Sequence, residues 1–319
     1  MNIIRIAFLA LALLPGHASA QTYPDRTIRI LVGFTPGSAT DISARMFAQK
    51  LSDSWAVPVT VENLPGGGGS VGGERVARSQ PDGYTLYWGA NGAMTINPSL
   101  QNNPTFDPIR DLAPVARLLV MPSILAVNND VPAKTVAELI ALAKAQPGKL
   151  TYASPGTGTP QHIAGEVLKR VAGIDIVHVP YRGANFTDVI GGRVTMTFMN
   201  AGSILPTVRE GKLRGLAITA RKRSPNMPEF PTMIEAGVAD FEATSWFGLL
   251  APVGTPPAVI AKLHQEAVRI VSHPDMREKY GLIGLDVVAD APDAFGEIIR
   301  ADTQKWAKVI KEAGIKAGE

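Results

Sequence analysis

The sequence predicts an α/β protein built of two lobes. Short apolar runs rich in branched residues alternate with glycine-containing turns and with segments whose apolar residues recur at helical spacing. That alternation is typical of a parallel sheet covered by helices. A proline-rich stretch from Asn97 to Pro122 interrupts the alternation, which then resumes. The interruption predicts a crossing from one lobe into a second.

The units of strand, turn and helix follow one another from near the N-terminus. An apolar run over Ile28–Phe34 predicts a buried strand, and the turn after it leads into a helix from about Asp41. The same order recurs in four further segments, which begin at the stretches 57–63, 84–90, 150–160 and 176–183. Ligands of such sheets are expected outside the carboxyl ends of the strands.

A second crossing, back to the first lobe, is predicted at Ser245–Pro252, whose sequence is SWFGLLAP. The helical segment that follows, Pro257–Ser272, is expected to pack on the first lobe. The chain is therefore expected to divide into a first lobe of residues 21–120 plus 245–319 and a second lobe of residues 121–244. Two crossings form a hinge, and a hinge between α/β lobes predicts closure on a small ligand.

The first twenty residues have the features of a cleavable export signal. Arg5 precedes an apolar run over Ile6–Leu14, which a Pro-Gly pair and the small residues Ala18-Ser19-Ala20 follow. The run is about half of the ~20 residues that a membrane-spanning helix needs. The sequence has no cysteine, which excludes a lipid-modified cysteine and disulfides. We expect cleavage after Ala20 and a soluble protein in a bacterial periplasm.

The composition argues against several classes of function. Charged residues make up 18% and apolar residues 45% of the chain, and its formal net charge is only +3. The dense basic run Arg221–Arg223 is expected in a solvated loop, so no nucleic-acid partner is predicted. The sequence contains no zincin motif, cysteine cluster or acidic calcium loop, so we expect neither a metal nor a cofactor. The protein is expected to act as a monomer.

Two turns, one in each predicted lobe, are built alike. Phe34–Asp41 places Thr35, Ser38 and Thr40 around Gly37, and Ser154–His162 places Ser154, Thr157 and Thr159 around Gly156 and Gly158. Glycine lets the backbone approach a ligand, and the first amides of a helix are unpaired donors with a partial positive charge. Each turn could be an ordinary capped helix start. Their occurrence in both lobes favours a ligand with an anionic group at each end.

A glycine-rich stretch, Val61–Glu74, matches two catalytic or cofactor motifs. Gly67-x-Gly69-x-x-Gly72 spells a dinucleotide fingerprint, and Gly68-x-Ser70-x-Gly72 spells a nucleophile elbow. The next predicted strand ends in Trp88-Gly89-Ala90-Asn91 without the required acid, and Ser70 lies too far beyond its strand for an elbow. We therefore predict a connection whose lack of side chains permits close packing. An exported serine hydrolase using Ser70 with His162, His178 or His264 is the alternative function.

Four segments together resemble the tripartite tricarboxylate transporter substrate-binding family, the Bug-type periplasmic receptors. They are YPDRTIRILVGFTPGSATDISARMFAQKL, VTVENLPGGGGSVGGERVARSQPDGYTLYW, YASPGTGTPQHIAGEVLKR and VHVPYRGA followed by GG. The resemblance implies a two-lobed, type II-like periplasmic binding-protein fold with the ligand cleft between the lobes. It also implies a receptor without catalysis that passes a small carboxylate to inner-membrane transporter subunits.

The family's binding loops match Phe34–Asp41 and Ser154–His162, and the resemblance implies that they hold a carboxylate largely through backbone groups and ordered water. Two departures are informative. Ser38 stands where members usually have glycine, and Asn200 stands where many carry an acid. The missing acid argues against an amino-acid ligand. We therefore expect a dicarboxylate, which could be aromatic, such as terephthalate.

The candidate ligand-binding residues are those of the two turns and a few at neighbouring strand ends. Trp88 and Asn91 are expected to supply a pocket wall and a polar contact, and His162 either a donor to the ligand or a cap. An aromatic ligand would suit Phe34, Trp88 and Phe198, which core packing would also explain. The full set is Phe34, Gly37, Ser38, Ala39, Thr40, Trp88, Asn91, Ser154, Gly156, Thr157, Gly158, Thr159, His162 and Asn200.

Overall fold

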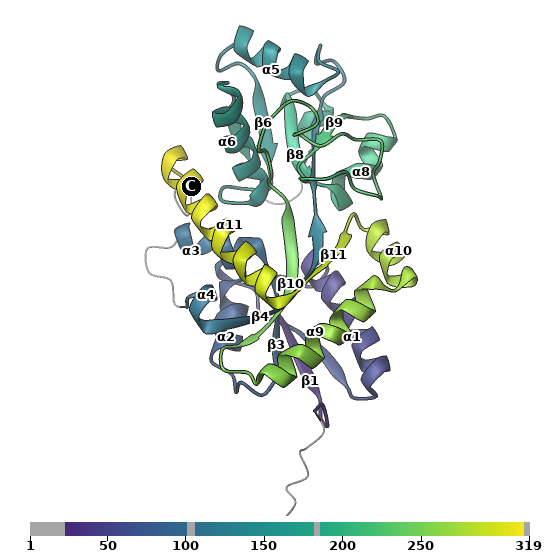
Figure 1. The fold of residues 1–319 in the computed structure, drawn as a ribbon. Helices are drawn as coiled ribbons and strands as arrows, with labels where there is room; N and C mark the ends of the chain where they lie inside the picture. The colour runs from purple at the N-terminus through teal and green to yellow at the C-terminus, as the bar shows by residue number, and fades with distance from the viewer. Residues whose placement is uncertain (1–22, 101–105, 182–185, 316–319) are drawn as a thin grey trace, which may run out of the picture.

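The computed structural model describes residues 23–100, 106–181 and 186–315, which form two sheets with helices packed around each (Figure 1). The export signal predicted over residues 1–20 lies outside the described residues. No helix within the described ranges is long and apolar enough to cross a membrane.

The first sheet has six strands in the order β11-β4-β10-β3-β1-β2. Its strands are β1 (Ile28–Val32), β2 (Val59–Asn63), β3 (Thr85–Ala90), β4 (Leu112–Met121), β10 (Ser245–Pro252) and β11 (Asp286–Asp290). The helices that accompany this sheet in the chain are α1 (Ala39–Trp55), α2 (Ser70–Ala77), α4 (Pro108–Asp111), α9 (Pro257–Ser272), α10 (Pro274–Leu282) and α11 (Pro292–Ala313). Short turns η1 (Gly67–Gly69) and η2 (Gly92–Ile96) precede α2 and α3 (Asn97–Leu100).

The second sheet has five strands in the order β7-β6-β8-β5-β9. Its strands are β5 (Ser123–Val127), β6 (Thr151–Ser154), β7 (Val177–Pro180), β8 (Met196–Asn200) and β9 (Arg214–Ile218). The helices of this part of the chain are α5 (Val136–Ala145), α6 (Pro160–Ala172), α7 (Thr187–Ile190) and α8 (Ala201–Arg209).

Both sheets are mixed, so the prediction of parallel sheets is only partly right. Strands β1, β2 and β3 are parallel, as are β6, β7 and β8, whereas β10 is antiparallel to β3 and β5 is antiparallel to β8. The antiparallel strands include those that carry the chain between the lobes. Since β10 arrives from the second sheet, it starts beside the end of β3, where Phe247 pairs with Ala90, and runs back along that strand.

The chain passes between the sheets at two neighbouring places. Pro122 alone separates β4 from β5, and the segment before β10 is still hydrogen-bonded to the second sheet through Ala243 and Thr219. The carboxyl ends of β3 and β8 lie at these crossings, because Ala90 pairs with Phe247 and Asn200 pairs with Ser123. The ends of the strands in both lobes therefore face the region between the lobes.

Helix α11 packs against both lobes and so adds a third link between them, beside the two chain crossings (Figure 1). Its first half packs Phe295 and Ile299 against Trp246 in the first lobe, whereas Trp306 and neighbouring residues belong to the core of the second sheet. The sequence places this helix wholly in the first lobe, so the structure adds a contact that the chain order does not reveal. Helix α9, by contrast, packs on the core of the first sheet as expected.

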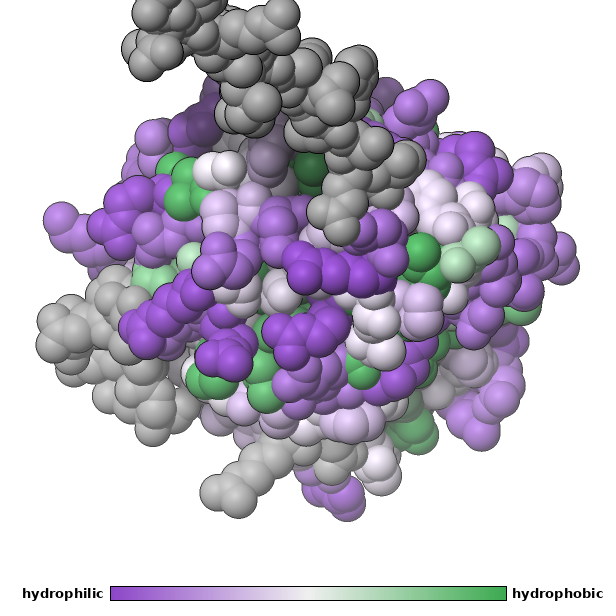
Figure 2. Space-filling view, turned by 90° about the horizontal axis from the view of Figure 1, so that it is seen from below, coloured by the Kyte–Doolittle hydropathy of each residue, from purple (hydrophilic) through white to green (hydrophobic). Residues whose placement is uncertain are grey.

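The lower face of the first lobe is largely hydrophilic (Figure 2). Apolar side chains on this face are scattered among polar and charged ones rather than gathered in one area. Scattered apolar residues are normal on the surface of a folded protein. The part of this face that Figure 2 leaves uncovered by grey atoms shows no apolar docking surface.

The glycine-rich stretch packs more closely than side chains would allow, which confirms its structural role. A Cβ added to Gly33 would lie 2.3 Å from the carbonyl oxygen of Gly69, and one added to Gly72 would lie 2.9 Å from Gly33 Cα. Gly69 itself has a φ of 104°, which side chains rarely adopt. The stretch fixes the loop after β1 to the start of α2.

We expect Gly33→Ala to lower the free energy of unfolding by about 1–3 kcal/mol, because the new methyl group would overlap backbone atoms that cannot move aside cheaply. The matched control is Gly92→Ala, where an added Cβ meets nothing within 4 Å. Urea denaturation followed by circular dichroism measures both. Equal midpoints for the two variants would contradict this account of the glycine stretch.

Candidate functional site

The loop after β1 ends in a capped helix. Ser38 is the N-cap of α1, with an extended backbone, and its hydroxyl accepts a hydrogen bond from the Asp41 amide at 3.3 Å. The helix begins at Ala39, two residues before the predicted start at Asp41. The backbone amides of Ala39 and Thr40 have no acceptor among the described residues. They are therefore available donors at the positive end of a 17-residue helix.

Asp41 holds this loop in shape, a role that the sequence did not reveal. Its buried carboxylate accepts hydrogen bonds from the Gly37 amide (2.9 Å), Arg45 Nε (2.9 Å) and Asn63 Nδ2 (2.8 Å). Asn63 also donates to the carbonyl oxygen of Phe34 at 3.0 Å. Burial alone would raise the pKa of Asp41, but the hydrogen bonds from Arg45, Gly37 and Asn63 outweigh it and leave the pKa lowered.

The loop after β6 ends in a similar cap. The Thr159 hydroxyl accepts from the His162 amide at 3.3 Å and donates to the carbonyl oxygen of Gly156 at 2.7 Å. Pro160 occupies the first helical position of α6. The amides of Thr157 and Gln161 have no acceptor within the described part of the chain. Each lobe thus presents two unpaired amides at the start of a capped helix.

Ser154 is held by contacts within the protein. Its side chain is fully buried at the end of β6, its hydroxyl lies 2.7 Å from His178 Nε2, and the Gly156 amide donates to it at 3.2 Å. These contacts give Ser154 a positioning role in the loop. The serine fixes the turn through Gly156, whose φ of 141° only glycine adopts readily.

Two histidines stack beneath this loop. The rings of His162 and His178 lie 3.9 Å apart at 15°, and Tyr152 stacks on His178 at 4.8 Å. The Gly158 amide donates to His162 Nδ1 at 3.1 Å, so the ring hydrogen of neutral His162 is on Nε2. Burial, reinforced by the charge of Lys169, lowers the pKa of His162 to about 4. Burial and the neighbouring His162 lower the pKa of His178 to about 4 as well.

We expect His162 and His178 to titrate near pH 4 in the folded protein. A histidine with a lowered pKa stabilises the fold while it is neutral, so its contribution is complete above about pH 6.5 and is lost as the pH falls toward 4. NMR titration of the ring signals, assigned with His162→Gln and His178→Gln, measures the midpoints. Midpoints near 6.5 would show that the rings are not buried together.

Two other predicted residues lie near the crossings and are bonded within the protein. Asn91 is buried at the end of β3 and donates from Nδ2 to the carbonyl oxygen of Thr244 at 3.2 Å. Asn200, at the end of β8, accepts from Gln161 Nε2 at 2.5 Å. Gln161 was not predicted, although its place directly after Pro160 in the first turn of α6 could have indicated it.

The prediction that Trp88 forms a pocket wall is wrong. Its side chain is fully buried, packs against Phe47 at 5.1 Å and donates from Nε1 to the Ser43 hydroxyl at 3.0 Å. Phe198 is equally buried and stacks on Phe241. Of the three aromatic candidates, only the half-buried Phe34 remains beside a loop. The aromatic argument for the ligand is correspondingly weaker.

The loop after β6 also contacts the first lobe. A Cβ added to Gly158 would lie 2.7 Å from Leu100 Cδ1 of α3. On the first-lobe side, the ring of Phe34 lies against Gly69, where an added Cβ would be 3.0 Å from Phe34 Cε2. The loops, η1 and α3 therefore border the space between the lobes.

The catalytic alternative lacks its geometry. Ser70 is 7% exposed at the start of α2, and no hydrogen bond found in the described ranges joins it to a histidine. His162 and His178 stack under the loop after β6, and His264 Nδ1 lies 3.1 Å from the carbonyl oxygen of Val115. No serine–histidine pair is assembled around Ser70.

Two α/β lobes joined at two crossings, each with unpaired amides at a capped helix start, form an architecture that suits a solute-binding receptor. Comparison with known proteins gives the family: residues 43–315 match the model described as "Tripartite tricarboxylate transporter family receptor", and the chain belongs to this family. Its structural neighbours are two-lobed periplasmic binding proteins. The family is therefore one of periplasmic receptors, not of enzymes.

Individual relatives agree along nearly the whole chain. Protein BugT of Bordetella pertussis is 34% identical over 324 residues, which is 99% of both chains. R. palustris Rpa4515, solved with adipate, is 32% identical with a TM-score of 0.79, and the match covers 92% of this chain and 99% of that one. MatC from Rhodopseudomonas palustris, solved with malate, is 30% identical with a TM-score of 0.74 over 90% and 100% of the two chains.

Proposed function

We propose that this receptor binds a dicarboxylate, with one carboxylate at each of the two capped helix starts. The observation that carries the proposal is the pair of unpaired amides in each lobe, at Ala39 and Thr40 in α1 and at Thr157 and Gln161 beside the start of α6. Amides at the start of a helix suit an anion because they are both unpaired and positively polarised. Two such groups in facing lobes suit an anion at each end of one ligand.

The energies are adequate for a receptor without a cationic side chain at the loops. A hydrogen bond to a charged group contributes about 1.5–3 kcal/mol, and a helix N-terminus adds about 0.3–1 kcal/mol. Four amides therefore supply roughly 6–12 kcal/mol before association costs of at least about 4 kcal/mol. At the upper end of this range, the free energy that remains after the association cost is roughly 8 kcal/mol, which corresponds to a micromolar dissociation constant.

The relatives and the end of β8 support a diacid over an amino acid. Relatives were solved with adipate and with malate, which are both dicarboxylates. Asn200 is neutral, and its side-chain oxygen already accepts from Gln161. An ammonium group would therefore find no counter-charge at this position.

The family also supports a proposal for the cellular setting. We propose that the chain is exported by its first twenty residues, acts as a monomer in the periplasm and delivers the diacid to the membrane subunits of a tripartite tricarboxylate-type transporter. The family's description as a transporter receptor supports the delivery step. The apolar run and the small residues before Gln21 support the export step.

A calorimetric panel on the protein without residues 1–20 tests the proposal. Adipate, malate and terephthalate are compared with glutamate and with leucine. We expect at least one diacid to bind at micromolar concentration and both amino acids to bind at least about tenfold more weakly, since their ammonium has no partner. An amino acid that bound more tightly than every diacid would contradict the proposal. The ratio of the adipate affinity to the terephthalate affinity then shows whether the site prefers an aliphatic or an aromatic group between the two carboxylates.

A further inference from the structure

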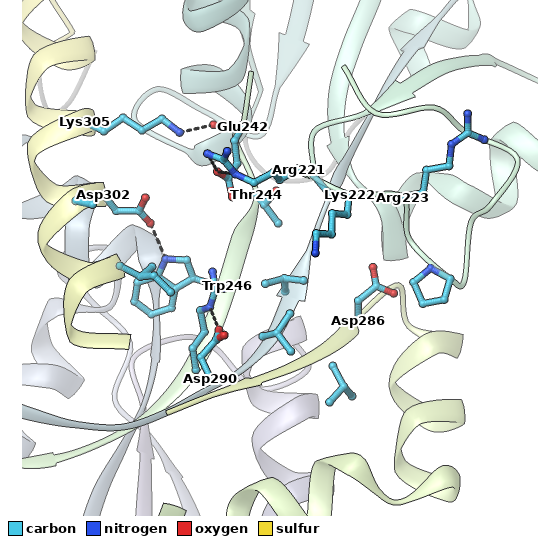
Figure 3. Close-up of a pocket in the computed structure, with 18 of the residues that line it drawn as sticks. Arg221, Lys222, Arg223, Glu242, Thr244, Trp246, Asp286, Asp290, Asp302 and Lys305 are labelled. Carbon is cyan, nitrogen blue, oxygen red and sulfur yellow. Dashed lines mark hydrogen bonds and ion pairs between the residues drawn. The ribbon is translucent and has the colours of Figure 1, made fainter. Parts of the chain in front are cut away.

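A second cavity lies on the side of the hinge that α11 and β11 border, and neither ligand loop lines it (Figure 3). Its volume is about 700 Å³, which is sufficient for a small organic molecule. One wall comes from the first lobe through α11, β11, β4 and the start of β10. The other comes from the second lobe through residues 220–225 and Glu242.

The acidic side chains of this cavity are already engaged by the protein. Asp290 pairs with Arg117 at 2.6 Å, and Asp302 accepts from Trp246 Nε1 at 2.8 Å. The remaining two acids are also held, Asp286 by Ser224 (2.9 Å) and Asn226 (2.7 Å), and Glu242 by Arg221 (3.0 Å). These carboxylates are therefore fixed parts of the wall rather than free groups.

Two ammonium groups of the cavity are not engaged in this way. The Lys222 side chain points into the cavity in Figure 3 and forms no ion pair with any described residue. Lys305 Nζ donates to the backbone oxygen of Glu242 at 2.6 Å and lies 4.4 Å from the Trp306 ring centroid, again without an ion pair in the described ranges. Burial lowers the pKa of Lys305, although the charges of Glu242 and Asp302 act in the opposite direction.

The rest of the wall is apolar. Val120 and Val287 come from neighbouring strands of the first sheet, Ile298 from α11, and the Trp246 ring from β10. Apolar walls with one or two converging charged groups are typical of small-molecule sites. An inorganic ion would use the ammonium groups but leave this apolar surface uncovered.

We propose that this hinge-side cavity is a second binding site for an organic anion with an apolar body. The anionic group would lie beside Lys222, and the body would cover Val287, Ile298 and the edge of Trp246. The ligand would contact both lobes at once. This site is separate from the diacid cleft and does not depend on the function proposed for that cleft.

Benzoate is a suitable probe, because it has one carboxylate and a flat apolar body. We expect calorimetry and tryptophan fluorescence to show benzoate binding to the protein without residues 1–20. Lys222→Ala should weaken it by about tenfold or more, the effect of one lost hydrogen bond to a charged group, and Lys222→Arg should restore most of the affinity. The matched control is Lys144→Ala, an exposed lysine of α5 that does not line the cavity.

Two further results separate this site from its alternatives. Ala39→Pro, which removes an amide donor from the diacid cleft, should leave benzoate affinity unchanged. Inorganic sulfate should displace benzoate poorly, because it has no apolar body. The proposal is overturned if benzoate does not bind, if Lys222→Ala and Lys144→Ala bind it equally, if Ala39→Pro abolishes its binding, or if sulfate competes as well as benzoate itself.

Discussion

An Ala39→Pro variant is expected to bind a diacid such as adipate about ten- to a hundredfold more weakly than the unaltered protein, with little change in thermal stability. Proline has no amide hydrogen, so the substitution removes one of the two unpaired donors at the start of α1. The first helical position tolerates proline because its amide makes no bond within the helix. Calorimetry and thermal denaturation measure the two effects separately.

The local backbone favours this substitution. Ser38, the preceding residue, has φ of −68° and ψ of 158°, the extended conformation that a residue before proline prefers. Helix α6 already carries Pro160 at the equivalent position. Ala39→Gly is the matched control, since it shortens the side chain but keeps the amide. Equal diacid affinities for the proline and glycine variants would show that this amide does not bind the ligand.

Asp41→Ala is expected to lower the free energy of unfolding by about 3 kcal/mol, because it leaves the donors of Gly37, Arg45 and Asn63 without their shared acceptor. Diacid binding should weaken as well, since these bonds hold the loop. The control is Asp53→Ala on the same helix. Among the described residues its exposed carboxylate accepts only from Gln49, so a change within about 0.5 kcal/mol is expected.

The effect of Asp41 should depend on pH in a defined direction. Its pKa is lowered in the folded protein, so its contribution is present above the unfolded value of about 3.9 and is lost as the pH falls through the folded value. Urea denaturation of the unaltered protein and of Asp41→Ala at pH 7 and at pH 3 measures this dependence. The difference in the free energy of unfolding between these two proteins should be smaller at pH 3. Similar stability for Asp41→Ala and Asp53→Ala at pH 7 would refute the assigned role.

The sequence predicts those parts of the site that depend on local signals. A hydroxyl residue, a glycine and the start of an apolar helical pattern lie within a few residues of one another, so the caps at Ser38 and Thr159 can be recognised directly. The glycine stretch could be separated from its two motif matches because those motifs require an acid or a serine at a fixed distance from a strand.

Features that depend on distant contacts could not be predicted in this way. Trp88 lies within a strand whose residues are buried on both faces, so its position does not show whether the ring faces the cleft or the core. In the sequence, Asp41 is an ordinary acidic residue in the first turn of a helix. Only the folded structure shows that Asn63, at the end of β2, donates a hydrogen bond to it. The pairing of Gln161 with Asn200 joins residues 39 positions apart, and no local pattern encodes it.

The central claim is that both carboxylates of the ligand are bound, one in each lobe. Adipate and hexanoate have the same number of carbon atoms, but hexanoate lacks one of the two carboxylates. Competition calorimetry that compares the affinity of hexanoate with that of adipate therefore tests the claim most directly. Losing two charge-assisted hydrogen bonds should make hexanoate weaker by roughly a hundredfold or more. Displacement of adipate by an equal concentration of hexanoate would show that only one carboxylate is recognised, and would contradict the account.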